Sequence, residues 1–103
     1  MNEFMRAKRR DEERERLARR YVWWMEPDAA LGDLPRLLCQ IMAFGTAGDY
    51  VAARCEWGEG AFKDALRSAR PGALDERSWV FWHRHFGLPE RALPKRHFDD
   101  ALS

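Results

Sequence analysis

The sequence lacks any apolar stretch long enough to cross a lipid bilayer. Its longest unbroken apolar run extends only from Tyr21 to Met25, whereas a membrane-spanning helix needs about 20 apolar residues. The first residues also lack the apolar core of a secretory signal, and their acidic side chains are not typical of a transit peptide. We therefore expect a cytoplasmic protein with no membrane contact.

Cysteine is scarce as well. The two cysteines, Cys39 and Cys55, form no CxxC pair, and each lies within an apolar pattern of helical spacing. A disulfide framework or a cysteine-based zinc site normally shows several closely spaced cysteines. Both residues are therefore predicted to be buried, reduced thiols.

No short motif of a common catalytic or nucleotide-binding site is present. The chain contains neither a phosphate-binding loop nor a GxGxxG sequence. Neither cysteine has the glycine-rich or cationic neighbours that activate a thiol. Asp99 and Asp100 lie in a polar tail, where paired carboxylates are ordinarily solvated. We therefore expect no enzymatic activity and no cofactor.

Three histidines join the two cysteines as residues that could supply zinc ligands. His83 and His85 are two residues apart on a predicted helix, so their side chains point in different directions. Paired metal ligands on a helix usually lie four residues apart. His97 lies in the polar tail. The sequence therefore predicts no metal site.

The charge is nearly balanced overall but unevenly distributed. The formal net charge is +1, yet residues 1–20 contain eight lysines and arginines against five acidic residues. Basic N-terminal segments contact nucleic acid in some proteins. A nucleic-acid-binding adaptor or autorepressor is therefore an alternative function, with Arg9, Arg10, Arg16 and Arg20 as its candidate contacts.

Apolar residues recur at helical spacing, and no segment shows the sustained alternation of a strand. Helices are predicted for residues 1–25, 33–44, 46–57, 61–69 and 76–86. The expected fold is all-α, a compact bundle of four to five short helices with a charged N-terminal helix. Its expected regions are a charged helical extension (1–20), a helical domain (21–90) and a polar C-terminal tail (91–103).

Capping residues indicate where these helices begin and end. Asp33, Thr46 and Asp75 each precede a helical segment and suit the N-cap position. Gly45 is predicted to end a helix in the left-handed conformation, and residues 28–32 are predicted to form a loop. The docking face of the first helix is predicted to contain Leu17, Tyr21, Trp24 and Met25.

The stretch WVFWHRHFG has the highest density of aromatic residues in the chain. Four of its residues share one helical face and are predicted to lie in the core: Trp79, Trp82, His83 and Phe86. Phe81 lies about 200° around the helix from Trp79, and His85 is on the same side as Phe81. That second side either packs inside the bundle or faces a partner, and the spacing leaves both possibilities open.

Residues 62–69 and 76–86 could also be read as a helix-turn-helix. A recognition helix needs polar side chains that reach base edges, and only Arg77, Arg84 and His85 could serve here. The turn is also long and contains a proline. Direct reading of DNA is therefore the weaker interpretation.

Features dispersed from Tyr21 to Leu88 follow a definite order. They are short combinations of aromatic, acidic, glycine and arginine residues near helix boundaries: Trp23-Trp24 with Glu26, Gly45-Thr46, Asp49-Tyr50, Trp57-Gly58, Arg70, Phe81-Trp82 and Gly87-Leu88. In order and spacing, this region resembles a family of small uncharacterised bacterial proteins that look like the antitoxin partners of AbiEii-type nucleotidyltransferase toxins. Residues 1–20 lie outside the resemblance.

The resemblance implies a protein without catalysis of its own. Such a protein would bind a nucleotidyltransferase toxin and block its active site or the access of its substrate. Aromatic and arginine side chains dominate the energetics of protein interfaces, and this chain contains five tryptophans and six phenylalanines. The partner-binding residues that we expect are Tyr21, Trp23, Trp24, Phe81, Arg84 and His85.

Overall fold

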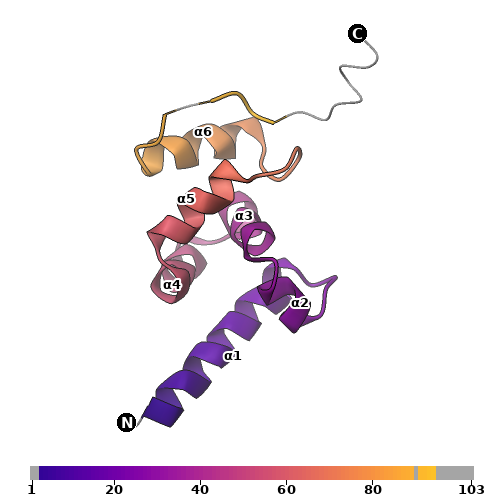
Figure 1. The fold of residues 1–103 in the computed structure, drawn as a ribbon, viewed down its shortest axis with the longest axis vertical. Helices are drawn as coiled ribbons and strands as arrows, with labels where there is room; N and C mark the ends of the chain where they lie inside the picture. Colours follow the sequence, from indigo (N-terminus) through magenta and orange to yellow (C-terminus); the bar gives the residue numbers. More distant parts are fainter. Residues whose placement is uncertain (1–2, 90, 95–103) are drawn as a thin grey trace.

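The computed structural model describes residues 3–89 and 91–94, apart from the side chain of Phe4, and these residues form six α-helices and no strand. The helices are α1 (Glu3–Tyr21), α2 (Pro27–Leu31), α3 (Leu34–Phe44), α4 (Ala47–Trp57), α5 (Glu59–Arg67) and α6 (Glu76–His85). Figure 1 shows their arrangement, with the N-terminus of α1 and helix α6 at opposite ends of the molecule. The all-α prediction is confirmed.

The sixth helix is α2, where the sequence predicted a loop, so that part of the prediction is wrong. Proline has no backbone N–H and a fixed φ, which suits the first position of a helix. Pro27 occupies that position, two alanines follow, and Ala30 is buried. Pro27 therefore begins a short helix as well as ending the preceding segment.

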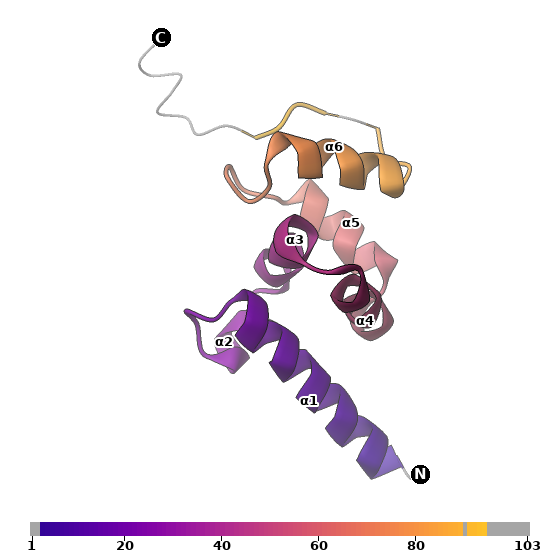
Figure 2. The ribbon, with the colours of Figure 1, turned by 180° about the vertical axis from the view of Figure 1, so that it is seen from behind.

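Helix α1 ends at Tyr21, earlier than its apolar pattern predicted. Leu17, Tyr21 and Val22 are buried. Trp24 was expected on the same face but is 48% exposed, because it lies in the loop after the helix. The first half of α1 extends away from the other helices, as both ribbon views show (Figures 1 and 2), and the described side chains from Met5 to Glu12 are exposed.

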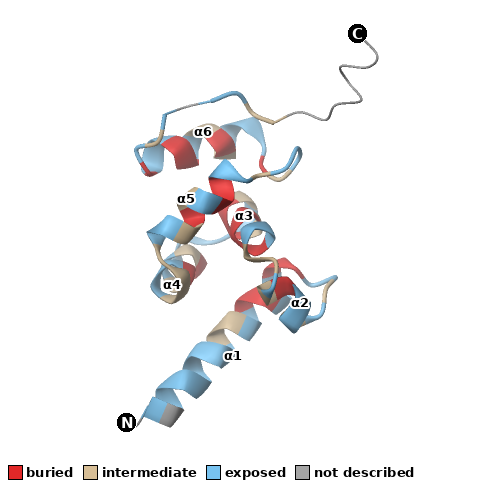
Figure 3. Cartoon of the chain, viewed as in Figure 1, coloured by how far each residue is buried: buried red, intermediate tan, exposed pale blue. Residues whose placement is uncertain are grey.

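Helix α3 lies at the centre of the molecule and contacts each of the other five helices. Its predicted apolar stripe is buried, with Leu37, Leu38 and Ile41 almost completely inaccessible. Figure 3 shows buried residues of α3, α5 and α6 facing one another. Burying one such side chain contributes about 1.5–3 kcal/mol, so this stripe provides much of the core.

Two of the three predicted N-caps are confirmed. The Thr46 hydroxyl accepts a hydrogen bond from the Asp49 backbone N–H at 3.1 Å, and the Asp75 carboxylate accepts one from Ser78 N–H at 2.7 Å. Asp33 also precedes its helix, but its carboxylate makes no capping hydrogen bond and pairs with Arg36 at 3.0 Å. The ion pair replaces the cap at this position.

The two cysteines differ in exposure. Cys39 is buried as predicted, whereas Cys55 is exposed, which contradicts the prediction that it is buried. Helix α4 has only Asp49 and Ala53 fully buried. The apolar pattern around Cys55 therefore suggested that more of α4 is buried against other helices than the structure shows.

Gly45 follows α3 with φ −77°, so the predicted left-handed conformation is wrong. The structure gives a different reason for glycine at this position. A Cβ atom built on Gly45 would lie 2.4 Å from the Ile41 carbonyl oxygen. The missing side chain therefore allows a close backbone approach where α3 ends.

Replacing Gly45 with alanine should destabilise the fold by about 1–3 kcal/mol, because the added methyl group forces a local shift. Gly60 is a matched control, since it lies in α5 and a Cβ there meets nothing within 4 Å. Gly60→Ala should raise the free energy of unfolding by about 0.5–1 kcal/mol. Urea denaturation of both variants measures this; an equal effect of the two substitutions would contradict the close-approach explanation.

Candidate partner-binding site

Helix α6 has a buried side and an exposed side. Trp79, Trp82, His83 and Phe86 are all buried, as their shared helical face predicted. His83 Nδ1 lies 2.7 Å from the Trp79 carbonyl oxygen, which explains how a buried imidazole is accommodated. Phe81 lies on the other side and is 55% exposed.

Trp82 determines how α6 is rotated on the core. Its indole N–H donates a hydrogen bond of 2.8 Å to the carbonyl oxygen of Met42, in the last turn of α3. Its ring also stacks on Phe86, with centroids 5.6 Å apart. A buried indole N–H needs such a partner, so the bond favours the rotation that leaves Phe81 outside.

The exposed Phe81 ring is held by its neighbours. It packs edge-to-face on Trp82 at 5.0 Å and stacks on the His85 ring at 5.9 Å with an interplanar angle of 16°. His85 Nε2 lies 3.3 Å from the hydroxyl oxygen of Tyr50, a residue of α4. We call Tyr50, Phe81, Trp82 and His85 the α6 aromatic surface. It presents an apolar ring whose orientation is largely set before any partner binds.

The structure excludes one of the two possibilities that the spacing of WVFWHRHFG left open, because the second side of α6 does not pack inside the bundle. Phe81, Arg84 and His85 are exposed, so all three predicted contacts of α6 are on its accessible side. Arg84 is adjacent in sequence to His85 near the end of the helix. Tyr50 belongs to the same surface but was not among the predicted site residues, because only the tertiary contact between α4 and α6 reveals it.

Trp23 and Trp24 form a second exposed aromatic pair in the loop between α1 and α2. They are 75% and 48% exposed, and their rings meet edge-to-face with centroids 5.6 Å apart. Tyr21 was expected to share this surface but is buried. The prediction that Tyr21 is a partner-binding residue is therefore wrong, because its side chain lies in the core and not on the surface.

Tyr21 belongs instead to a polar cluster that links α1 to α4. Its hydroxyl donates a hydrogen bond of 2.5 Å to the buried Asp49 carboxylate. Arg16 Nη2 lies 3.1 Å and Arg20 Nε 3.4 Å from the same carboxylate. The Tyr21 hydrogen bond and the Arg16 guanidinium hold the pKa of Asp49 below its ordinary value, while burial raises the pKa of Tyr21. Asp49 is therefore a charged anchor for α1.

This cluster divides the four arginines of the nucleic-acid alternative. Arg16 and Arg20 are paired with Asp49, and Arg16 also pairs with Glu13 at 2.5 Å. Arg9 and Arg10 are exposed on the projecting half of α1. The structure therefore does not present the four side chains as one free basic surface.

Helix α6 does not have the outer face of a typical recognition helix. Its bulkiest ring among the exposed side chains is Phe81, and Arg77 and Arg84 are the exposed arginines on either side of it in sequence. The segment between α5 and α6 runs from Ser68 to Asp75, which is longer than the three or four residues of a helix-turn-helix. The aromatic character of this face suits a protein surface better than a DNA groove.

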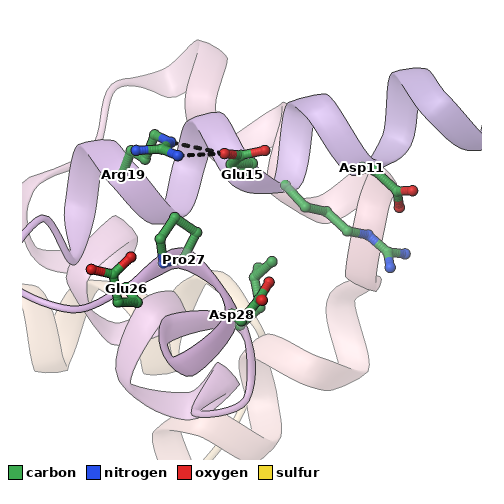
Figure 4. A pocket seen from close by; sticks show the side chains of 8 residues that line it. Asp11, Glu15, Arg19, Glu26, Pro27 and Asp28 are labelled. Carbon is green, nitrogen blue, oxygen red and sulfur yellow. Dashed lines mark hydrogen bonds and ion pairs between the residues drawn. The ribbon is translucent and has the colours of Figure 1, made fainter.

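A cleft of about 510 Å³ separates α1 from α2 (Figure 4). Four carboxylates line it, from Asp11, Glu15, Glu26 and Asp28. Glu15 is paired with Arg19 at 2.6 Å, and Figure 4 shows the other labelled carboxylates spread along the walls. Among the described residues, no three histidine, cysteine or acidic side chains are grouped closely enough to hold a metal ion.

The buried thiol of Cys39 has little reactivity. Burial raises the pKa of the Cys39 thiol to about 11, with a smaller effect of Asp33, so the thiol is protonated at neutral pH. A protonated thiol is a poor nucleophile and a poor metal ligand. His97, considered above as a zinc ligand, lies outside the described residues.

Two exposed apolar residues were missed by the sequence analysis. Phe44 is 75% exposed although it falls on the same helical face as Leu37 and Ile41. It is the last residue of α3, where the chain leaves the helix at Gly45. Val51 is 45% exposed because α4 is covered on only one side. Helical spacing in the sequence cannot show which parts of a helix are covered by other helices.

No known protein family, curated protein or solved structure matches this chain. Within the described residues, none of the six helices combines the length and the apolar character needed to cross a bilayer.

Removing the Tyr21 hydroxyl with Tyr21→Phe should cost about 1.5–3 kcal/mol at neutral pH, the value typical of a hydrogen bond to a charged group. The folded pKa of Asp49 is below its ordinary value of 3.8, so its contribution is present above that pH and is lost as the pH falls through the folded pKa. The difference between parent and variant should therefore shrink in acid. Denaturant unfolding at pH 7 and below pH 4 measures it; a difference that stays constant would contradict the charged anchor.

Proposed function

We propose that this protein is a non-catalytic protein-binding regulator of the cytoplasm. In its specific form, the proposal is an antitoxin-like inhibitor of a nucleotidyltransferase toxin. The α6 aromatic surface is its main contact with the partner. One observation carries the proposal: Phe81 is more than half exposed, yet its ring is held by Trp82 and His85.

The physical argument concerns the cost of ordering side chains. An apolar ring exposed to water gains free energy when a partner covers it. A ring that is already oriented loses little conformational entropy on binding, which favours affinity. The Tyr50 hydroxyl near His85 links the surface to α4, so two helices support the anchor. Rigid aromatic anchors of this kind are typical binding hot spots.

Trp23 and Trp24 are a second proposed contact, since exposed tryptophans are enriched at interfaces. The Asp49 cluster holds the end of α1 on α4 and thereby positions this loop relative to the core. The two aromatic sites lie on different elements. A partner that covers both would have to extend over a large part of the molecule, as an enzyme domain can.

The non-catalytic part of the proposal rests on how the reactive groups are used. Asp49 is occupied by Tyr21 and arginine, His83 contacts a backbone carbonyl, and the Cys39 thiol is buried and protonated. Each of these groups has a structural role in the described part of the chain. The toxin as partner comes from the resemblance alone, and it implies inhibition by covering the active site or the substrate path.

The nucleic-acid alternative retains one supporting observation. Arg6, Lys8, Arg9 and Arg10 are exposed on the projecting half of α1, with no acidic residue between them. Phosphate contacts weaken steeply as salt rises, whereas an interface centred on aromatic anchors is much less salt-sensitive. Binding measured at two salt concentrations therefore distinguishes the two functions.

Replacing Phe81 with alanine should weaken partner binding by at least 2 kcal/mol, a Kd ratio of roughly 30 or more. The thermal melt should change little, because the ring is exposed. Phe44→Ala is the matched control, since Phe44 is an exposed phenylalanine without ring contacts in the described part of the chain. Affinity capture from the native host, with nuclease treatment, identifies the partner, and titration of the purified partner gives the Kd values.

The same experiment tests the partner's identity. A stoichiometric protein with nucleotidyltransferase activity, inhibited by the parent and not by Phe81→Ala, would support the specific form. Equal effects of the two phenylalanine variants would remove the special role of the α6 aromatic surface. Unfolding of the Phe81→Ala protein would show that Phe81 stabilises the core.

A further inference from the structure

A second cleft, of about 620 Å³, lies between the beginning of α3 and the turn that follows α5. It is separate from the α6 aromatic surface, and its wall also includes Trp24 from the loop before α2. Two arginines line it: Arg36 from α3 and Arg70 from the turn. An aromatic ring and two guanidinium groups from three different segments thus border one cavity.

Both arginines are attached to ordered structure. Arg36 Nε lies 3.0 Å from the Asp33 carboxylate in an ion pair, and its Nη1 lies 3.9 Å from the Met25 sulfur. These contacts involve two of its nitrogens and orient the planar group. Arg70 is exposed and has no ion-pair partner among the described residues.

The turn that carries Arg70 is well defined. The Ala73 N–H donates to the Arg70 carbonyl oxygen at 3.0 Å, with Pro71 and Gly72 at the two central positions. Gly72, the third residue of this turn, has φ +84°, a positive value that glycine adopts without strain. The backbone at Arg70 is therefore fixed relative to α5, on the side of the cleft opposite α3.

The rest of the lining combines polar and apolar side chains, and its polar members are Gln40, Ser68 and the Asp33 carboxylate that pairs with Arg36. Cys39, Pro35, Ala69 and Ala73 contribute apolar surface between the two arginines. The Cys39 thiol donates a hydrogen bond to the Ala65 carbonyl oxygen, with the sulfur 3.7 Å from the oxygen. The cleft therefore offers a flat indole, the exposed Arg70 guanidinium, the Arg36 guanidinium paired with Asp33, and an apolar floor. This combination suits binding and not covalent chemistry.

We propose that this cleft binds one nucleotide unit of a single-stranded nucleic acid. The base stacks on the indole of Trp24, and the adjoining phosphate is bound by Arg36 and Arg70. Stacking aromatics beside a positive groove are the usual elements of single-strand binding, and guanidinium groups bind phosphate with two N–H groups at once. This site lies apart from the α6 aromatic surface, but it shares Trp24 with the second partner contact proposed above.

An acidic peptide is the competing ligand class, and the lining favours the nucleotide. A peptide would need an aromatic residue beside its carboxylate to contact both Trp24 and the arginines, whereas every nucleotide supplies both a planar base and a phosphate. The basic edge also continues beyond the cleft. Arg91 Nη2 donates to the Leu66 and Arg67 carbonyl oxygens at 2.9 and 3.0 Å, at the end of α5. A strand leaving the cleft there would meet a further cation.

The test is fluorescence anisotropy of labelled oligo-dT and oligo-U 12-mers with the full-length protein at low salt. Trp24→Ala should weaken binding about 5- to 150-fold, the ratio that corresponds to about 1–3 kcal/mol of base stacking. Trp23→Ala is the matched control, because Trp23 is 75% exposed but does not line the cleft. It should change binding less than about twofold.

A plot of log K against log salt concentration has a negative slope, and Arg70→Gln should reduce the magnitude of this slope by about 0.7. That is the value for one phosphate contact to a single strand. Arg67→Gln is its control, since Arg67 is exposed, lies outside the lining and pairs with Asp64 at 3.0 Å. Thermal melts of the four variants should match the parent. Phe81→Ala should leave oligonucleotide binding unchanged, which separates this site from the proposed partner surface.

Several results would overturn the proposal. One is that neither 12-mer binds. Another is that Trp24→Ala and Trp23→Ala weaken binding equally. A third is that a poly-glutamate peptide displaces the labelled 12-mer as effectively as unlabelled oligonucleotide does. Binding that is lost in an Arg9→Gln, Arg10→Gln double variant and retained in Trp24→Ala would move the contact to the projecting half of α1.

Discussion

The hydrogen bond from the Trp82 indole to the Met42 carbonyl oxygen is the constraint on which the proposed partner surface depends. Helix α6 carries aromatic residues on both of its sides. Burial of apolar surface alone would therefore allow more than one rotation of the helix about its axis. The indole N–H adds a directional requirement, because leaving it buried without a partner costs about 1–3 kcal/mol. With the bond formed at 2.8 Å, Trp79, His83 and Phe86 face the core and Phe81 is left in solvent.

A second polar interaction controls the other end of the molecule. The buried Asp49 carboxylate joins Tyr21 and two arginines of α1 to the first turn of α4. Burying an unpaired carboxylate would be costly, so α1 must end with Tyr21 near Asp49. The chain leaves the helix after Tyr21; Val22 is still buried, and beyond it Trp23 and Trp24 are 75% and 48% exposed. The core thus dictates the exposure of both aromatic sites.

Most of the fold could be predicted because its signals are local. The apolar stripe of α3, the Thr46 and Asp75 caps, and the inward face of α6 all follow from residues within one or two turns. Some errors are local, such as the missed helix α2 and the conformation of Gly45, but those at the candidate site concern long-range partners. Tyr21 was assigned to the surface because its bond to Asp49 crosses 28 positions, and Tyr50 was missed because its contact with His85 crosses 35. Cys55 and Phe44 show that an apolar pattern does not tell which elements remain uncovered.

Photo-crosslinking from position 81 shows whether the Phe81 side of α6 meets a protein partner. A benzoylphenylalanine placed at position 81, expressed in the native host, keeps an aromatic ring in the same place. We expect a light-dependent covalent adduct with one protein, and a much weaker one when the same group is placed at position 44. No adduct from position 81, or equal adducts from both positions, would contradict it.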